Sequence, residues 1–116
     1  MTPSLEARLR AHAEQTYPDE CVGALLGHGD EVREVLPLEN SAANRRTGFA
    51  LTAREYLRAE AQAEARGLEV LGLYHSHPDA PAVPSARDAA VLRSFRRAVI
   101  ISVRAGVATE VTVTAS

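Results

Sequence analysis

Apolar positions recur at helical spacing in two segments of the chain, and both segments carry signals for the helix ends. The first follows Pro3-Ser4, which is typical of an N-cap, and stops at Tyr17-Pro18. The second opens at Thr52-x-x-Glu55, the pattern of a capping box, and closes after Arg66 at a glycine. The pattern therefore predicts one amphipathic helix near the start of the chain and another near its middle.

Short apolar runs lie between and after these helices, and their lengths favour strands. A run that is apolar at every position predicts a strand buried on both faces, whereas an alternating run predicts one face in water. We expect strands over 21–26, 31–36, 49–51, 70–76, 98–103 and 107–113. A further helix is expected from Ser85 to Arg93 or Phe95. Helices interspersed with mainly buried strands predict an α/β sandwich.

Composition narrows the class of protein. With 116 residues, 46% of them hydrophobic, the chain is expected to form one domain over residues 1–116. One cysteine excludes a disulfide framework within the chain and fits a reducing compartment. We see neither a signal-peptide pattern nor an apolar run of about 18 residues, so we expect a cytoplasmic protein that has no membrane partner. A net charge of −2 without a basic block argues against a nucleic-acid partner.

The segment Tyr74-His75-Ser76-His77-Pro78 stands at the polar end of an apolar run and suggests a metal site. Strand side chains alternate, so two histidines at i and i+2 project from one face and can meet one ion. Further along, Ser85 is followed three residues later by Asp88, after a stretch stiffened by prolines. Two imidazoles and one carboxylate fit tetrahedral zinc, whose fourth position is then left to water as in a catalytic site.

Each part of this pattern also has an ordinary structural interpretation. Ser85-x-x-Asp88 fits a helix N-cap, with the hydroxyl accepting a backbone N–H and the carboxylate in the first turn. The histidine pair fits polar residues at the edge of a loop, with Pro78 ending the strand. The metal interpretation is favoured because ligand type, spacing and strand-to-helix context occur together.

The sequence His75-Ser76-His77-Pro78, the seven residues between His77 and Ser85, and Asp88 resemble the signature of the JAMM metalloproteases, the catalytic branch of the MPN domains. The upstream glutamate of that family is matched by Glu20, directly before an apolar run. The resemblance implies a cytidine-deaminase-like MPN sandwich, a mixed sheet flanked by helices. It also implies that His75, His77 and Asp88 hold one zinc ion, that Glu20 transfers the proton of the attacking water to the leaving amine, and that Ser85 donates to the oxyanion.

The same resemblance implies the kind of substrate. JAMM enzymes cleave an amide after the C-terminal Gly-Gly of ubiquitin or of a ubiquitin-like protein, and small members are linked to sulfur carriers of the ThiS or MoaD type. Two alternatives stay open at this point, a non-catalytic MPN scaffold that only binds proteins and a ubiquitin-specific deubiquitinase. A zinc nucleoside deaminase is excluded, because its Pro-Cys-x-x-Cys ligands cannot be built from one cysteine. A homodimer paired through an edge strand is also possible.

A few other residues carry expectations of their own. Cys21 adjoins the proposed base, and we expect it to be a small buried hydrophobic residue rather than a reactive thiol. The helical His12 and the turn residue His28 are expected to be solvated. The polar segment 39–48 is expected to be a loop, and the resemblance implies that Asn40, Arg45 or Arg46 contacts substrate, whereas a solvated loop is the alternative.

Overall fold

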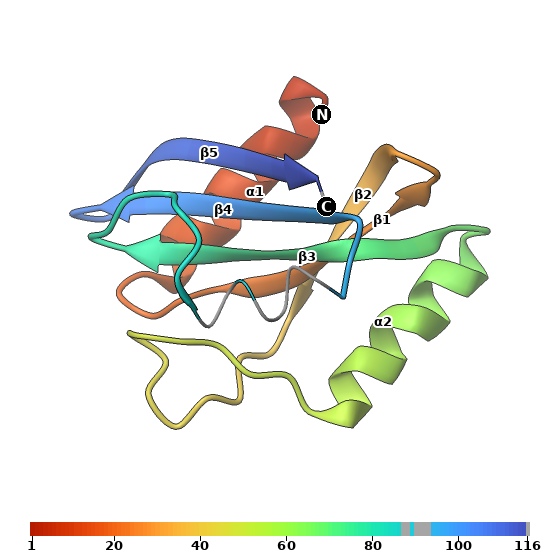
Figure 1. Cartoon of the computed structure of the whole chain (residues 1–116), viewed down its shortest axis with the longest axis horizontal. Coiled ribbons are helices and arrows are strands. Elements are labelled where there is room, and N and C mark those ends of the chain that lie inside the picture. The colour runs from red at the N-terminus through yellow and green to blue at the C-terminus, as the bar shows by residue number, and fades with distance from the viewer. Residues whose placement is uncertain (87–88, 90–93, 116) are drawn as a thin grey trace.

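The computed structural model describes residues 1–86, 89 and 94–115, and these form a mixed five-stranded sheet with two long helices (Figure 1). The elements are α1 (Pro3–Thr16), β1 (Val22–His28), β2 (Glu31–Leu38), α2 (Ala53–Ala65), β3 (Glu69–Pro78), β4 (Arg97–Arg104) and β5 (Val107–Ala115). The strand order is β2-β1-β3-β4-β5, in which β3 and β4 are parallel and the other pairs antiparallel. The predicted α/β class with a mixed sheet is confirmed.

Both helices begin at a threonine whose side-chain oxygen accepts a backbone N–H. Thr2 accepts from Leu5 at 3.2 Å, and Thr52 accepts from Glu55 at 3.1 Å. The predicted cap of α1 at Pro3-Ser4 was therefore slightly late, because proline lacks an N–H and fits the first helical turn. Neither α1 nor α2 is long and apolar enough to cross a membrane, and the described residues contain no other helix that is.

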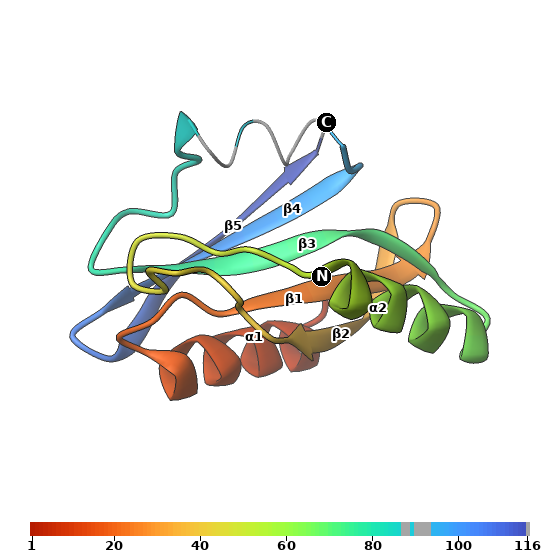
Figure 2. The same cartoon turned by 90° about the horizontal axis from the view of Figure 1, so that it is seen from below.

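The two helices cover opposite faces of the sheet (Figure 2). Alternate residues along β1 and the residue before it point to opposite faces, so Cys21 and Leu25 join the core under α1, whereas Val22, Ala24 and Leu26 join the core under α2. From α1 the first core receives three fully or nearly fully buried side chains, and from α2 the second receives two alanines that allow close packing. Both faces of β1 are therefore buried, as its apolar run predicts.

Two predicted elements differ from the structure. Residues 49–51 were predicted as a strand, but they form irregular backbone, because the Ala50 N–H donates to the Asn40 side chain and its C=O accepts from Ser41. The predicted helix from Ser85 lies mostly outside the described residues. Within them, the Ala89 N–H donates to the Ser85 carbonyl at 3.0 Å, and Phe95 is not helical.

Tyr74 anchors α1 to the central strand β3. Its ring is fully buried and lies over Gly23 of β1, where any Cβ would collide with the ring, so this position requires glycine. Its hydroxyl lies 2.7 Å from Nδ1 of His12. Burial raises the pKa of Tyr74 and lowers the pKa of His12, so the hydroxyl donates to a neutral imidazole. The expectation that His12 is solvated was wrong, whereas His28 is exposed as expected.

Candidate metal centre and adjoining cleft

The antiparallel pairing of β1 with β3 brings Glu20 to the two histidines. Val22 lies opposite His75, and continuing this register for two residues along each strand places Glu20 opposite His77. Side chains two apart share a face, so all three functional groups project on the same side of the sheet. The apolar runs that fix this register also fix the site, since a slip of one residue would turn Glu20 toward α1.

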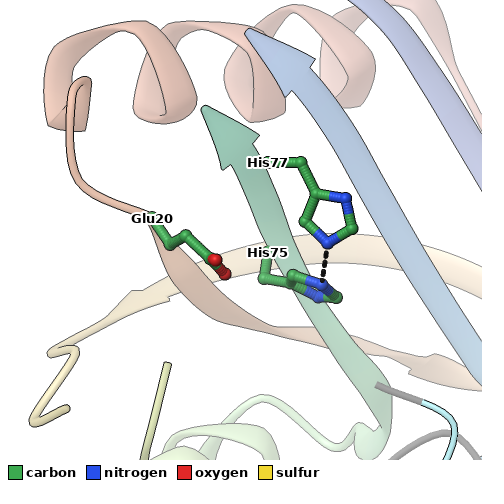
Figure 3. Close-up of side chains that lie close together, drawn as sticks. All are labelled: Glu20, His75 and His77. Atoms are coloured by element: carbon green, nitrogen blue, oxygen red, sulfur yellow. Dashed lines mark hydrogen bonds between the residues drawn. The ribbon is translucent and has the colours of Figure 1, made fainter. Parts of the chain in front are cut away.

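Glu20, His75 and His77 converge at the ends of their strands (Figure 3). Their ligand atoms all lie within 4.8 Å of one another, and the two Nε2 atoms are 3.0 Å apart. Glu20 is 6% exposed and His75 is 3% exposed, so both groups are withdrawn from bulk water. Polar groups that are buried this close together are typical of a site that binds or activates a ligand.

The orientation of each imidazole is set by a neighbour. Nδ1 of His77 lies 2.9 Å from the Pro81 carbonyl, to which its N–H donates, leaving the lone pair of Nε2 directed at the site. The ring of His75 packs against Phe49, with ring centroids 4.6 Å apart and planes at 36°. A carbonyl behind one histidine and an aromatic ring against the other hold both Nε2 atoms in place.

The donor set fits zinc. Imidazole nitrogens and carboxylate oxygens are common zinc ligands, and at Zn–N distances of about 2.0–2.1 Å two tetrahedral nitrogen ligands lie about 3.3 Å apart. The observed Nε2–Nε2 separation of 3.0 Å is close to that value. The hydrogen bond from Nδ1 of His77 to a backbone carbonyl is also the arrangement that metal-binding histidines usually show. The two histidines can therefore serve as ligands of the metal that the sequence motif implies.

A cleft of about 400 Å³ opens beside this group. One wall comes from the loop between β2 and α2, and the other from the segment after β3. The lining residues are Glu20, Arg46, Thr47, Gly48, Phe49, His77, Pro78, Ala80, Pro81, Val83 and Ser85. Glu20 and His77 therefore face a space that is large enough to receive a ligand between two walls of mixed polar and apolar character.

A family model for prokaryotic homologs of the JAB domain matches residues 2–114. The chain belongs to this family. A solved structure described as "JAMM: a metalloprotease-like zinc site in the proteasome and signalosome" shares 18% identity with this JAB domain at a TM-score of 0.62, over 97% of this chain and 82% of that one. At this identity the likeness shows the fold, and it confirms the expected MPN architecture.

Two curated relatives of the JAB domain have descriptive names. This chain is 40% identical over 79 residues to a probable TtuB-protein conjugate cleaving protease of Thermus thermophilus, and the match covers 68% of this chain and 53% of that protein. It is 34% identical over 87 residues to a desampylase of Haloferax volcanii, covering 73% of this chain and 63% of that protein. The matched region of this chain therefore spans less than two thirds of the length of either relative.

The structure describes the positions of Ser85 and Cys21 but not that of Asp88. Ser85 is exposed and lines the same cleft as Glu20 and His77, so the structure brings it to the site. Asp88, the predicted third zinc ligand, lies outside the described residues. Cys21 is 2% exposed, and its pKa is raised to about 11, chiefly by burial, so the thiol stays protonated near neutral pH. The expectation that Cys21 is buried is confirmed, and its lack of reactivity stays a prediction.

The loop over 39–50 contributes residues whose roles the sequence pattern does not reveal. Phe49 packs on His75, although its sequence context predicted only a short strand. Arg46 lines the cleft, and its contact with substrate stays a prediction. Asn40 does not face the cleft as a substrate contact would, because it is 9% exposed and its side-chain amide is bonded to backbone on all sides. A polar residue in a polar segment carries no signal that distinguishes such a buried role.

Proposed function

We propose that this JAB domain is a zinc metallopeptidase that hydrolyses the amide bond after the C-terminal Gly-Gly of a ubiquitin-like or sulfur-carrier protein. The observation that carries the proposal is the convergence of Glu20, His75 and His77 on one cleft, in a chain of the JAB family. The names of the two relatives, a conjugate-cleaving protease and a desampylase, support a protein conjugate as the substrate. A sulfur carrier of the ThiS or MoaD type is the specific candidate.

His75 and His77 would hold the zinc ion, and Asp88 would be the third ligand, as the sequence motif implies. Zinc supplies a Lewis acid that polarises a carbonyl and makes a water molecule acidic enough to attack at neutral pH. The backbone bond at Pro81 fixes the tautomer of His77, so this ligand requires no rearrangement before it binds. Phe49 shields the ring of His75 on the side of the cleft wall.

Glu20 acts as the general base and then as the general acid. Its carboxylate lies beside the two histidines and lines the cleft, so it can reach both the attacking water and the departing amine. It removes a proton from the water as the new C–O bond forms, and it delivers that proton to the nitrogen as the C–N bond breaks. Ser85, on the same cleft, donates a hydrogen bond to the oxyanion, a contact often worth about 3 kcal/mol in hydrolases.

The test is intact-mass spectrometry of a sulfur carrier that carries a short extension after its C-terminal Gly-Gly. Zinc-loaded protein is expected to release the extension and leave the carrier ending at the second glycine, whereas chelator-treated protein is not. A carrier whose last glycine is replaced by valine serves as the matched substrate control and is expected to stay intact. If zinc binds but no carrier or ubiquitin fusion with this ending is cut, the proposed activity is wrong and the non-catalytic scaffold gains support.

We further propose that the 116 residues act as one catalytic domain in the cytoplasm. One continuous sheet with a helix on each face supports the single domain, and one reduced, buried cysteine is compatible with a reducing compartment. The edge strands β2 and β5 are where a homodimer would pair. Light scattering of the zinc-loaded protein at two concentrations tests the dimer, which is refuted by a constant monomer mass.

A further inference from the structure

Asn40 uses every hydrogen-bonding position of its side-chain amide inside the protein. Nδ2 donates to the carbonyls of Glu20 at 3.0 Å and Gly48 at 3.1 Å. Oδ1 accepts the N–H groups of Ala42 at 3.0 Å and Ala50 at 3.1 Å. An asparagine offers two donors and two acceptor positions, so the group is fully satisfied. A buried polar side chain with complete bonding fixes the positions of all the backbone groups it contacts.

One of these four bonds joins the proposed base to the loop that forms one wall of the cleft, and the other three hold that loop together. Glu20 precedes β1 and is held from both sides, since its N–H donates to the Arg45 carbonyl at 2.6 Å and its carbonyl accepts from Asn40. Both contacts come from the same loop. The backbone of Glu20 is therefore positioned by the 39–50 loop in addition to the ladder of the sheet.

The same side chain also positions the wall residue that packs on a zinc-ligand histidine. Gly48 and Ala50, which bond to Asn40, flank Phe49, whose ring lies 4.6 Å from that of His75. A second contact joins the beginning and the end of the loop. The Ser41 N–H donates to the Ala50 carbonyl at 2.9 Å and so reinforces this part of the wall. Asn40 is thus the point at which the base, the cleft wall and the ring beside His75 are connected.

We propose that Asn40 is a positioning residue that holds Glu20 in register with the two histidines. It acts through the backbone of Glu20 and does not touch the substrate. Its catalytic consequence rests on the proposed function, whereas its effect on the position of Glu20 does not. A displacement of about 1 Å in a reacting group can cost about a hundredfold in rate, so loosening this one contact is expected to be visible in turnover.

The test is the substitution Asn40→Asp. Aspartate has nearly the same shape and keeps both accepted bonds, but it cannot donate to the carbonyls of Glu20 and Gly48 when ionised. Asn44→Ala is the matched control, because Asn44 lies in the same loop, is exposed, and its side chain accepts the N–H of the nearby Arg46 at 3.2 Å. Asn40→Ser, which removes at least one donated bond without changing the charge, replaces the aspartate variant if that variant does not fold.

Four quantities are measured on each protein: amide hydrogen exchange at Glu20 by NMR, zinc affinity by chelator competition, and kcat and KM for cleavage of the extended carrier. In Asn40→Asp we expect exchange at Glu20 to be at least tenfold faster and kcat at least tenfold lower. The dissociation constant for zinc and KM are expected to stay within threefold, because both histidines belong to β3. Asn44→Ala is expected to match the wild type in every quantity.

Unchanged protection of the Glu20 amide in Asn40→Asp would overturn the proposal, as would an equal loss of zinc affinity and kcat, which would indicate general damage to the site. A wild-type protein that binds zinc and cleaves nothing would contradict the proposed function alone. In that case the exchange rate at Glu20 still decides whether Asn40 positions it.

Discussion

Ser76, between the two histidines, supports the strand register on which the metal centre depends. Its side chain is fully buried, and its Oγ accepts the backbone N–H of Cys21 at 2.7 Å. The N–H of Ser76 in turn donates to the carbonyl of Cys21 at 3.2 Å. These two bonds tie the beginning of β1 to the end of β3, directly beside Glu20. Ser76→Ala removes the bond between the Cys21 N–H and the Ser76 hydroxyl. Because Cys21 is buried, bulk water does not supply a replacement acceptor for its N–H.

The expected cost follows from the burial of that N–H. A buried donor left without an acceptor costs about 1–3 kcal/mol, and the N–H of the buried Cys21 becomes such a donor, so we expect a loss of about 2 kcal/mol in the free energy of unfolding. This is a large part of the total for a domain whose stability is typically about 5–15 kcal/mol. Urea unfolding of the zinc-free protein, followed by circular dichroism, measures the loss.

Ser41→Ala is the matched control for this prediction. The Ser41 hydroxyl also bonds to the backbone, by donating to the carbonyl of Ala50 at 3.0 Å, but it is exposed and the same carbonyl already accepts the Ser41 N–H. We expect it to change the free energy of unfolding by less than about 0.5 kcal/mol. If Ser76→Ala costs no more than Ser41→Ala, the claim that this hydroxyl secures the register is refuted.

Further predictions concern the metal, its histidines and pH. His77→Ala is expected to weaken zinc binding at least a hundredfold in a chelator competition, and unchanged affinity would exclude His77 as a ligand. Pro81→Ala keeps the backbone carbonyl that accepts from Nδ1 of His77, so its zinc affinity is expected to stay within threefold. Burial lowers the pKa of His12 below 6.5, so the unfolded chain binds the proton more readily, and stability is expected to fall as the pH drops below about 6.5. His12→Gln is expected to flatten that dependence in urea unfolding at pH 5 and 7, and an unchanged slope would contradict it.

The part of the site that depends on local pattern was predictable from the sequence. Two histidines two apart at the end of an apolar run must share a face of a strand, and the structure confirms that their rings meet. Glu20 precedes a second such run, and antiparallel pairing of the two runs brings it to the histidines. The resemblance to the JAMM signature supplied the pairing of distant segments, which periodicity alone does not.

The contribution of the 39–50 loop could not be predicted, because it depends on contacts between segments that have no regular pattern. Phe49 packs on His75, which is distant in the sequence. From its apolar neighbours alone, a strand was predicted instead. Asn40 is buried because four backbone groups converge on it, which nothing in its neighbourhood along the chain indicates. His12 was misjudged for the same reason, since its partner Tyr74 lies on a strand far along the chain.

The role of Glu20 as base is tested by comparing Glu20→Gln with the wild type in zinc binding and in carrier cleavage. We expect the variant to bind zinc with an affinity within about threefold of the wild type and to release no extension from the Gly-Gly carrier, because the amide cannot accept and return a proton. Cleavage at the wild-type rate would contradict the role of Glu20 as base. Loss of zinc from the variant would make Glu20 a ligand and would contradict the assignment of the metal to the histidines and Asp88.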